Sequence, residues 1–199
     1  MHPIRLLAAA AAISAVSSSA AFSQDTRINV RGVITAFEGT TLSVKSRTGD
    51  AISVEVPEAT GVATTKPFAL ADITPGMALG VTTIKRADGT VVAIDIRPIP
   101  PAAPQGLSAW DLAPDAVMTN AVAEGTVASA VGQELTLNYK TGTVKALVVP
   151  ETAMSQAVSG DRRDLKPGET VFVFSRKGSD GKLTANRVQV SKDGVKPTQ

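Results

Sequence analysis

The chain has 199 residues, a formal net charge of +2, no Cys and a single His, His2. Because His2 lies in the N-terminal segment that we expect to be removed, the mature chain would have no His and no Cys. This excludes Ser-His-Asp and Cys-His nucleophile systems, and also zinc or copper sites built from imidazole and thiolate. Acid/base chemistry would be left to carboxylates, Lys or Tyr139, and metal binding to a hard cation such as Ca²⁺. Basic and acidic residues are interspersed, so we expect no nucleic-acid partner. No motif of a cofactor site is present, and we expect no cofactor.

Met1 to Ser23 has the three-part layout of a secretory signal peptide. Arg5 gives a positive start, an apolar run extends from Leu6 to Val16, and small residues follow to Ser23. The run is shorter than the roughly 20 residues that a membrane-spanning helix needs, and no other segment approaches that length. We therefore expect cleavage after Ser23, a periplasmic or secreted protein, and no transmembrane span in the mature chain.

The remaining sequence contains two copies of one module. The matched pairs lie mainly at turns and strand ends, where backbone geometry restricts the choice of residue. They include Gly32 with Gly125, Thr48-Gly49 with Thr141-Gly142, Pro57 with Pro150, Asp72 with Asp164, Pro75-Gly76 with Pro167-Gly168, and Asp88-Gly89 with Asp180-Gly181. We interpret this as an internal duplication.

Within each copy, apolar and polar residues alternate with the period of half-buried strands. Five strands are expected per copy, at 28–34, 41–45, 52–56, 77–81 and 91–96, and again from Val127, at 135–139, 144–149, 171–173 and 183–190. Pro57 and Pro150 should each end a third strand, because proline cannot donate to the ladder. The stretches 58–74 and 151–166 then form long loops, with one short helical turn near residues 68–72.

Three strands, a longer connection and two further strands are the layout of a small OB-like barrel. The predicted fold is all-β, with two tandem five-stranded OB-like barrels at residues 24–97 and 122–190. A Pro-rich connector spans 98–121, and its Trp110, Leu107, Leu112 and Met118 are expected to pack against one or both barrels. The polar tail, 191–199, is expected to fray.

Each copy resembles the small bacterial envelope domain of unknown function catalogued as DUF5666. The resemblance lies in the strand-opening Gly32 or Gly125, in Asp72-Ile73-Thr74-Pro75-Gly76 or Asp164-Leu165-Lys166-Pro167-Gly168, and in Asp88-Gly89 with Ala93 or Asp180-Gly181 with Ala185. It covers most of residues 28–97 and 122–190. It implies an exported, OB-like β-barrel and no catalytic residue.

Two aromatic groups are candidates for a ligand or partner surface. Trp110, with Asp111 and Met118, has the composition of a binding hot spot, or else pins the connector between the barrels. Phe172 and Phe174 lie two apart and share one strand face, where the first copy has Gly80 and Thr82. They could stack on a sugar or a base, or else pack in a core or between the barrels, with Val171 and Val173 then on the other face.

Arg162 and Arg163, in the mixed-charge run 161–164, are weaker candidates. They could hold an acidic partner through bidentate contacts, or else belong to a solvated loop with local ion pairs. The Asp-Gly pairs lack the ligand spacing of a Ca²⁺ loop and are interpreted as turns, so no metal site is predicted.

We expect an exported non-catalytic binding or scaffold protein of the bacterial envelope, whose partner is an envelope protein, a glycan or a small ligand. One alternative is an accessory protein for divalent metal ion handling or transport through surface carboxylates. The other is an enzyme that uses carboxylates or Lys only. The sequence leaves the ligand and the oligomeric state open.

Overall fold

The computed structural model describes residues 26–129 and 132–198, so the predicted signal peptide lies outside the described residues. The described chain is all-β, as expected. Its strands are β1 (Thr26–Glu38), β2 (Thr41–Ser46), β3 (Ala51–Glu55), β4 (Gly61–Pro67), β5 (Ala78–Lys85), β6 (Val91–Pro98), β7 (Gly106–Ala109), β8 (Val117–Ser129), β9 (Gly132–Tyr139), β10 (Gly142–Ser159), β11 (Thr170–Lys177) and β12 (Leu183–Val190). Two short 3-10 turns, η1 (Leu70–Asp72) and η2 (Arg162–Asp164), complete the described structure. The first confirms the helical turn expected near residues 68–72.

The two expected long loops are partly strands. β4 lies inside the first, and β10 runs straight through Pro150 into the second. The pairing of β10 with β6 shifts register between Val148 and Ala153, so Pro150 lies at an irregularity rather than at a strand end. The first expectation failed because Val62-Ala63-Thr64-Thr65 is rich in β-branched residues, which favour strands, but does not alternate between apolar and polar residues.

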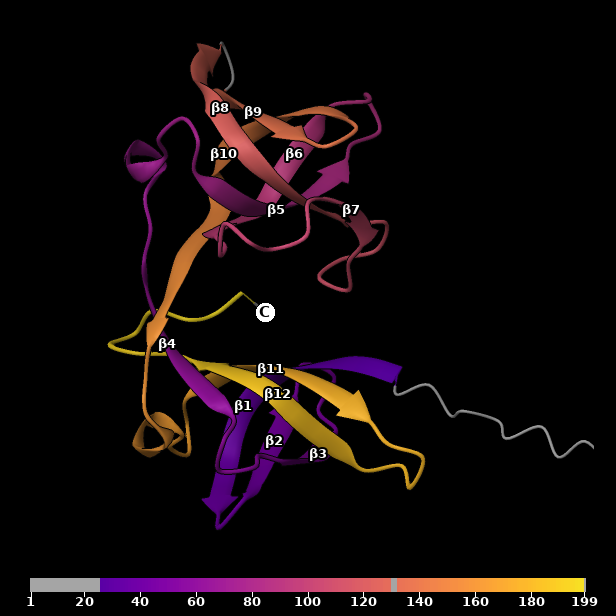
Figure 1. Ribbon diagram of the computed structural model, residues 1–199, viewed down its shortest axis with the longest axis vertical. Helices are drawn as coiled ribbons and strands as arrows, with labels where there is room; N and C mark the ends of the chain where they lie inside the picture. The colour runs from indigo at the N-terminus through magenta and orange to yellow at the C-terminus, as the bar shows by residue number, and fades with distance from the viewer. Residues whose placement is uncertain (1–25, 130–131, 199) are drawn as a thin grey trace, which may run out of the picture.

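The strands form two units, each with a circuit of paired strands (Figure 1). In unit I, β1 pairs with β2, β2 with β3, β3 with β12, β12 with β11 and β11 with β1. In unit II, β8 pairs with β9, β9 with β10, β10 with β6, β6 with β5 and β5 with β8. β4 joins the two units, because it pairs with β12 and with the second part of β10.

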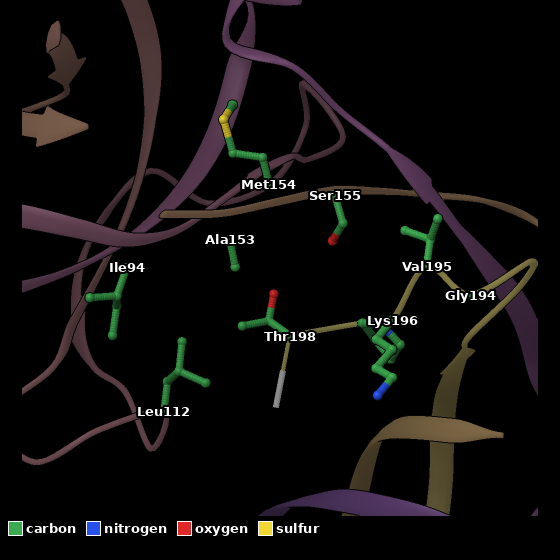
Figure 2. A pocket seen from close by; sticks show the side chains of 10 residues that line it. Ile94, Leu112, Ala153, Met154, Ser155, Gly194, Val195, Lys196 and Thr198 are labelled. Carbon is green, nitrogen blue, oxygen red and sulfur yellow. The ribbon is translucent and has the colours of Figure 1, made fainter. Parts of the chain in front are cut away.

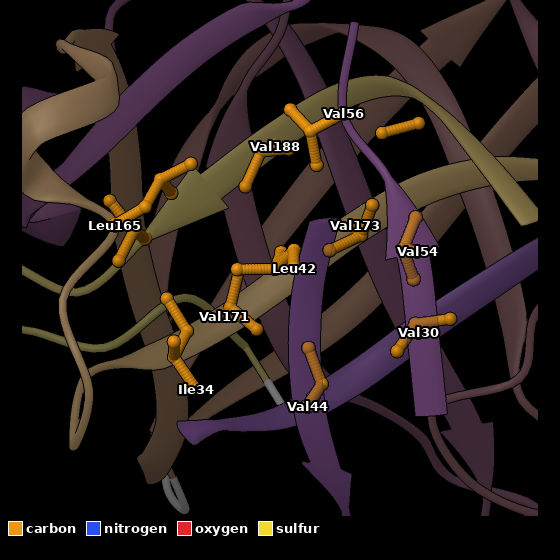
Figure 3. Close-up of a cluster of buried hydrophobic side chains, with 12 residues drawn as sticks. Val30, Ile34, Leu42, Val44, Val54, Val56, Leu165, Val171, Val173 and Val188 are labelled. Atoms are coloured by element: carbon orange, nitrogen blue, oxygen red, sulfur yellow. The ribbon is translucent and has the colours of Figure 1, made fainter. Parts of the chain in front are cut away.

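Each unit has a hydrophobic core of its own. The core of unit I comes from both repeats and is drawn in Figure 3: Val30, Ile34, Leu42, Val44, Val54, Val56, Leu165, Val171, Val173, Ala185, Val188 and Val190. That of unit II is also mixed: Phe68, Leu79, Val81, Ala93, Ile96, Ala121, Ala123, Leu135, Leu137, Ala146 and Val148. Burial of these side chains is the main stabilising contribution in a chain without disulfides.

The expected tandem grouping of strands, 24–97 and 122–190, is therefore not that of the structure. The first three strands of each repeat pair with the last two strands of the other. The physical reason is the straight antiparallel pairing of β4 with β10, from Ala63 opposite Ser159 to Pro67 opposite Ser155. These two segments carry the chain from one unit to the other instead of turning back.

The structure also corrects the alignment of the repeats at their first strand. β1 has an irregularity after Ile34, and β8 has the same irregularity after Ala123. The amide of Ile34 bonds to the carbonyl of Glu169, and the amide of Ala123 bonds to the carbonyl of Met77. Ile34 therefore corresponds to Ala123, and the sequence match of Gly32 with Gly125 is wrong in structural terms.

The connector and the tail are more ordered than expected. β7 pairs with β8, and Met118 is buried as predicted, whereas Leu107 is half exposed. In the tail, Pro197 is buried and the hydroxyl of Thr198 donates to Asp95, so residues 191–198 do not fray. The described residues include no helix with the length and hydrophobicity to cross a membrane.

Candidate ligand-binding cavity between the two units

One outer face of unit I carries aromatic and cationic side chains toward unit II. Strand alternation places Val171 and Val173 in the core, and Phe172 and Phe174 on the opposite face. Across the ladders, Phe172 lies between Arg31 on β1 and Gln189 on β12, and Phe174 lies between Asn29 and Arg187. The sequence prediction that the two Phe share a face is confirmed.

Arg31 is the centre of the aromatic contacts. Its guanidinium carbon lies 4.1 Å from the ring centroid of Phe172 and 5.6 Å from that of Trp110. The Phe172 ring is 4.3 Å from the tilted ring of Phe174 and meets Trp110 edge to face, with 6.4 Å between centroids. Because Arg31 is only 4% exposed, these cation–π contacts lie in a desolvated environment, where they are strongest.

Asp111 neutralises Arg31. It forms an ion pair with Arg31 and accepts a 3.0 Å hydrogen bond from the side-chain amide of Asn29. Burial raises the pKa of Asp111, but the hydrogen bond and positive charge of Arg31, together with Asn29, outweigh it, so this pKa lies below its ordinary value. Burial lowers the pKa of Arg31, and Asp111 opposes that effect. The predicted group of Trp110, Asp111 and Met118 therefore joins the two units.

Unit II contributes a second arginine. The guanidinium carbon of Arg97 on β6 lies 5.4 Å from the Trp110 ring centroid. Arg97 forms a 3.2 Å ion pair with Asp95, whose side chain is fully buried. The hydroxyl of Thr82 donates to the same carboxylate at 3.4 Å. Both carboxylates near the aromatic group are thus already paired with an arginine.

A cavity of about 560 Å³ opens beside these residues, between the two units. Its lining comes from β1, β6, β7, β8, β10, β11, β12 and the connector. The lining residues are Arg27, Arg97, Pro98, Ile99, Pro100, Ala103, Ser108, Trp110, Met118, Asn120, Ala157, Phe174, Arg187 and Gln189. Three of them are arginines and none is acidic.

Arg187 is a cation of this lining that has no ion-pair partner among the described residues. Arg187 is exposed to solvent. Nearby protein atoms still desolvate its guanidinium in part, which lowers its pKa, and the charge of Arg97 lowers that pKa further. Among residues 26–129 and 132–198, no carboxylate pairs with Arg187 or with Arg27. The indole N–H of Trp110 is also buried without an acceptor among the same residues.

Protein-family models, curated proteins and solved structures give no match to this chain. The candidate site therefore rests on geometry and chemistry alone.

A second cavity, of about 720 Å³, lies against the C-terminal tail (Figure 2). Its walls are mainly apolar or small, with Ile94, Leu112 and Met154 on one side, and its single charged residue is Lys196. We consider the smaller cavity the better candidate, because charged, aromatic and amide side chains converge there. Among the described residues, no three carboxylates gather as a metal site would need.

Two predicted candidates lie elsewhere. Arg162 donates to the carbonyl oxygens of Pro57 at 2.9 Å and Val56 at 3.1 Å, and its guanidinium lies over the Phe37 ring. Arg163 forms an exposed ion pair with Asp161 at 2.9 Å. Arg162 holds backbone carbonyls within unit I, and Arg163 belongs to a solvated turn. Both agree with the alternative of a solvated loop with local interactions.

Sequence reasoning missed Arg31, Arg97 and Arg187, because isolated arginines on strands are typical of ordinary exposed positions. A comparison of the two repeats could have indicated Arg187. Arg187 occupies the position that Asp95 has in the other repeat, just as Phe172 and Phe174 replace Gly80 and Thr82. Substitutions of this size on one strand face indicate that the two repeats serve different purposes there.

Proposed function

We propose that the protein is an exported, non-catalytic binding protein of the bacterial envelope, built from two OB-like units related to the DUF5666 domain. Its ligand would occupy the cavity between the units. The observation that carries this proposal is the convergence of Trp110, Phe174, Arg97 and Arg187 on one cavity, from strands of both repeats. The signal-like N-terminus supports export, since Met1 to Ser23 has the required layout.

The size and chemistry of the cavity support a ligand of small-molecule or monosaccharide dimensions. Its volume lies inside the range of about 300–1,000 Å³ that such sites occupy. Aromatic and proline rings supply apolar surface, while Ser108, Asn120 and Gln189 add polar groups. The side-chain amides of Asn120 and Gln189 also donate within the protein, to the Pro104 carbonyl and the Thr65 hydroxyl, which fixes their orientation. A glycan end, a small metabolite or a short segment of an envelope protein would fit this description.

The difference between the repeats favours a single site on the junction. The facing positions of the two units can be matched through their ladders. The matched pairs, unit I first, are Arg31 with Asn120, Asn29 with Met118, Phe172 with Gly80, Phe174 with Thr82, Gln189 with Arg97, and Arg187 with Asp95. The face of unit I is large and cationic, whereas that of unit II is small and carries its own counter-charge. The duplicated module has thus diverged at the surface where its copies meet.

Neither alternative gains support from the described residues. Divalent metal handling would need a gathering of carboxylates, and none is found among them. An enzyme that uses carboxylates or Lys would place such a residue in its cavity, whereas the lining of this one contains neither. The lining therefore supports the binding proposal better than the enzymatic one.

Thermal unfolding of the chain from Gln24 onward, with Trp110 fluorescence as a second signal, tests this function. The additives are envelope glycan fragments, small metabolites, Ca²⁺ and Mg²⁺. A ligand that binds only the native state at 100 times its dissociation constant adds roughly 2.7 kcal/mol of stability, and we expect one organic additive to do so and to change Trp110 emission. The Phe174→Ala variant should lose this response. A shift with Ca²⁺ or Mg²⁺ alone, or one that Phe174→Ala retains, contradicts the proposal.

A further inference from the structure

We propose that the ligand of the inter-unit cavity is an organic anion, in which a carboxylate, phosphate or sulfate group is joined to an apolar ring. This inference rests on the proposed function, because it names the ligand class of the same cavity. It follows from the charge balance of the lining and from the arrangement of its apolar residues.

The lining carries a positive charge that the protein does not neutralise. Of its three arginines, Arg97 is paired with Asp95 at 3.2 Å. Arg27 and Arg187 have no carboxylate partner among residues 26–129 and 132–198, and no lining residue is acidic. Guanidinium groups that converge on one concave surface match the geometry of an oxyanion, since they donate in a planar fork.

The surroundings of Arg187 disfavour its positive charge. Arg187 lies opposite Phe174 on the neighbouring strand, and burial first, then the charge of Arg97, lowers its pKa. Both arginines line the same cavity. An anion that contacts both guanidinium groups would replace their mutual repulsion with two attractive contacts.

The rest of the lining selects for an apolar ring. Apolar side chains make up much of the lining, namely Phe174, Trp110, Met118, Pro98 and Pro100. A free inorganic anion would leave these side chains wet, whereas a ring attached to the anion would cover them. The preferred ligand therefore combines both features, and each feature alone should bind more weakly.

Three probes separate these contributions in the full mature chain. Phenyl phosphate has the ring and the anion, inorganic phosphate has the anion alone, and benzyl alcohol has the ring alone. Binding is followed by isothermal titration calorimetry and by Trp110 fluorescence, at low salt and at 0.5 M NaCl. We expect phenyl phosphate to bind at least tenfold more tightly than either other probe, and its affinity to fall at high salt because the charges are screened.

The Arg187→Gln variant tests the site. Arg187 has no described partner, so this change should leave folding intact, as near-ultraviolet circular dichroism will check. It should weaken phenyl phosphate at least tenfold, the loss expected for one charge-assisted hydrogen bond. Arg86→Gln is the matched control, because Arg86 is an exposed arginine in the β5–β6 hairpin and does not line the cavity.

Several results would overturn the inference. Benzyl alcohol binding as tightly as phenyl phosphate would show a neutral site and leave the proposed function standing. An equal loss of affinity in Arg187→Gln and Arg86→Gln would show non-specific charge attraction. If none of the three probes binds and no additive shifts the unfolding midpoint, the anion inference and the proposed function both fail.

Discussion

The guanidinium carbon of Arg31 lies 4.1 Å from the ring centroid of Phe172, its partner across the β1–β11 ladder. Arg31 belongs to the first repeat and Phe172 to the second. The contact therefore exists only because the repeats exchange strands. Phe172 also packs against Trp110 and Phe174, which line the cavity. The exchange of strands and the cavity therefore depend on the same residues.

Removal of the Phe172 ring should destabilise the whole molecule. The side chain is 1% exposed and contacts Arg31, Trp110 and Phe174. We expect Phe172→Ala to lower the free energy of unfolding by about 3–5 kcal/mol, as for other buried Phe. Phe174→Ala should cost about 1–2 kcal/mol, because Phe174 is only half-buried and lines the cavity. Urea unfolding measures both, and equal losses would contradict this arrangement.

Asp111 should make stability depend on pH in the acid range. Its pKa is lower in the folded protein than in the unfolded chain, so its contribution is present above about pH 4 and is lost as pH falls through the folded pKa. At pH 7 we expect Asp111→Asn to cost about 1–2 kcal/mol, at the low end for a pair with a buried Arg, because the Asp111 side chain is 45% exposed.

Unfolding curves at several pH values provide the test for Asp111. The difference between the natural protein and Asp111→Asn should shrink below about pH 4, since a protonated Asp resembles Asn. Glu134→Gln is the control, because its ion pair with Lys145 is exposed and should matter little. A difference that stays constant down to pH 2 would show that the Asp111 charge does not stabilise Arg31.

Gly32 and Gly125, which match in sequence, should respond oppositely to substitution. A Cβ on Gly32 would lie 2.0 Å from the carbonyl oxygen of Lys45, a backbone atom of the neighbouring strand. At Gly125, beside the irregularity in β8, no atom lies within 4 Å of such a Cβ. We expect Gly32→Ala to cost about 3 kcal/mol through overpacking, and Gly125→Ala to be neutral or to stabilise by about 0.4–1 kcal/mol.

The urea midpoints of the two alanine variants decide this point. Similar losses in both would mean that the two glycines are structurally equivalent, as the sequence alignment suggests. A loss confined to Gly32→Ala agrees with the structural correspondence of Ile34 with Ala123.

The sequence predicted the strands well because strand signals are local. Alternation marked most of the core, including Leu42, Val54 and Val171, and glycine turns such as Asp88-Gly89 marked the hairpins. The choice of partner strand was beyond such reasoning. β11 can pair with a β1-like strand of either repeat through the same local signals, and what decides between them is whether β4 turns back or continues.

The candidate site was predicted in part for the same reason. Trp110, Phe172 and Phe174 are rare residue types in a chain with few aromatics, so they were noticed from composition. The arginines were not, because their role depends on which strands meet. Arg31 approaches Phe172 through a ladder between the two repeats. Arg187 meets Phe174 within one hairpin, but it shares the cavity with Arg97 only because the two units meet there.

The exchange of strands between repeats is tested most directly by disulfide trapping, since the natural chain has no Cys. Val33 faces Thr170 across the β1–β11 ladder, and cross-strand partners lie within the Cα separation that a disulfide accepts. In a tandem arrangement, Ala78 would take the place of Thr170 opposite Val33. In the structure, Ala78 instead faces Val122.

The test uses two double variants, Val33→Cys with Thr170→Cys and Val33→Cys with Ala78→Cys. Both are oxidised under native conditions and assayed for free thiols and for gel mobility without reductant. We predict that only the first forms an intramolecular disulfide. A disulfide in the second and free thiols in the first would contradict the exchange, and with it the cavity that the exchange creates.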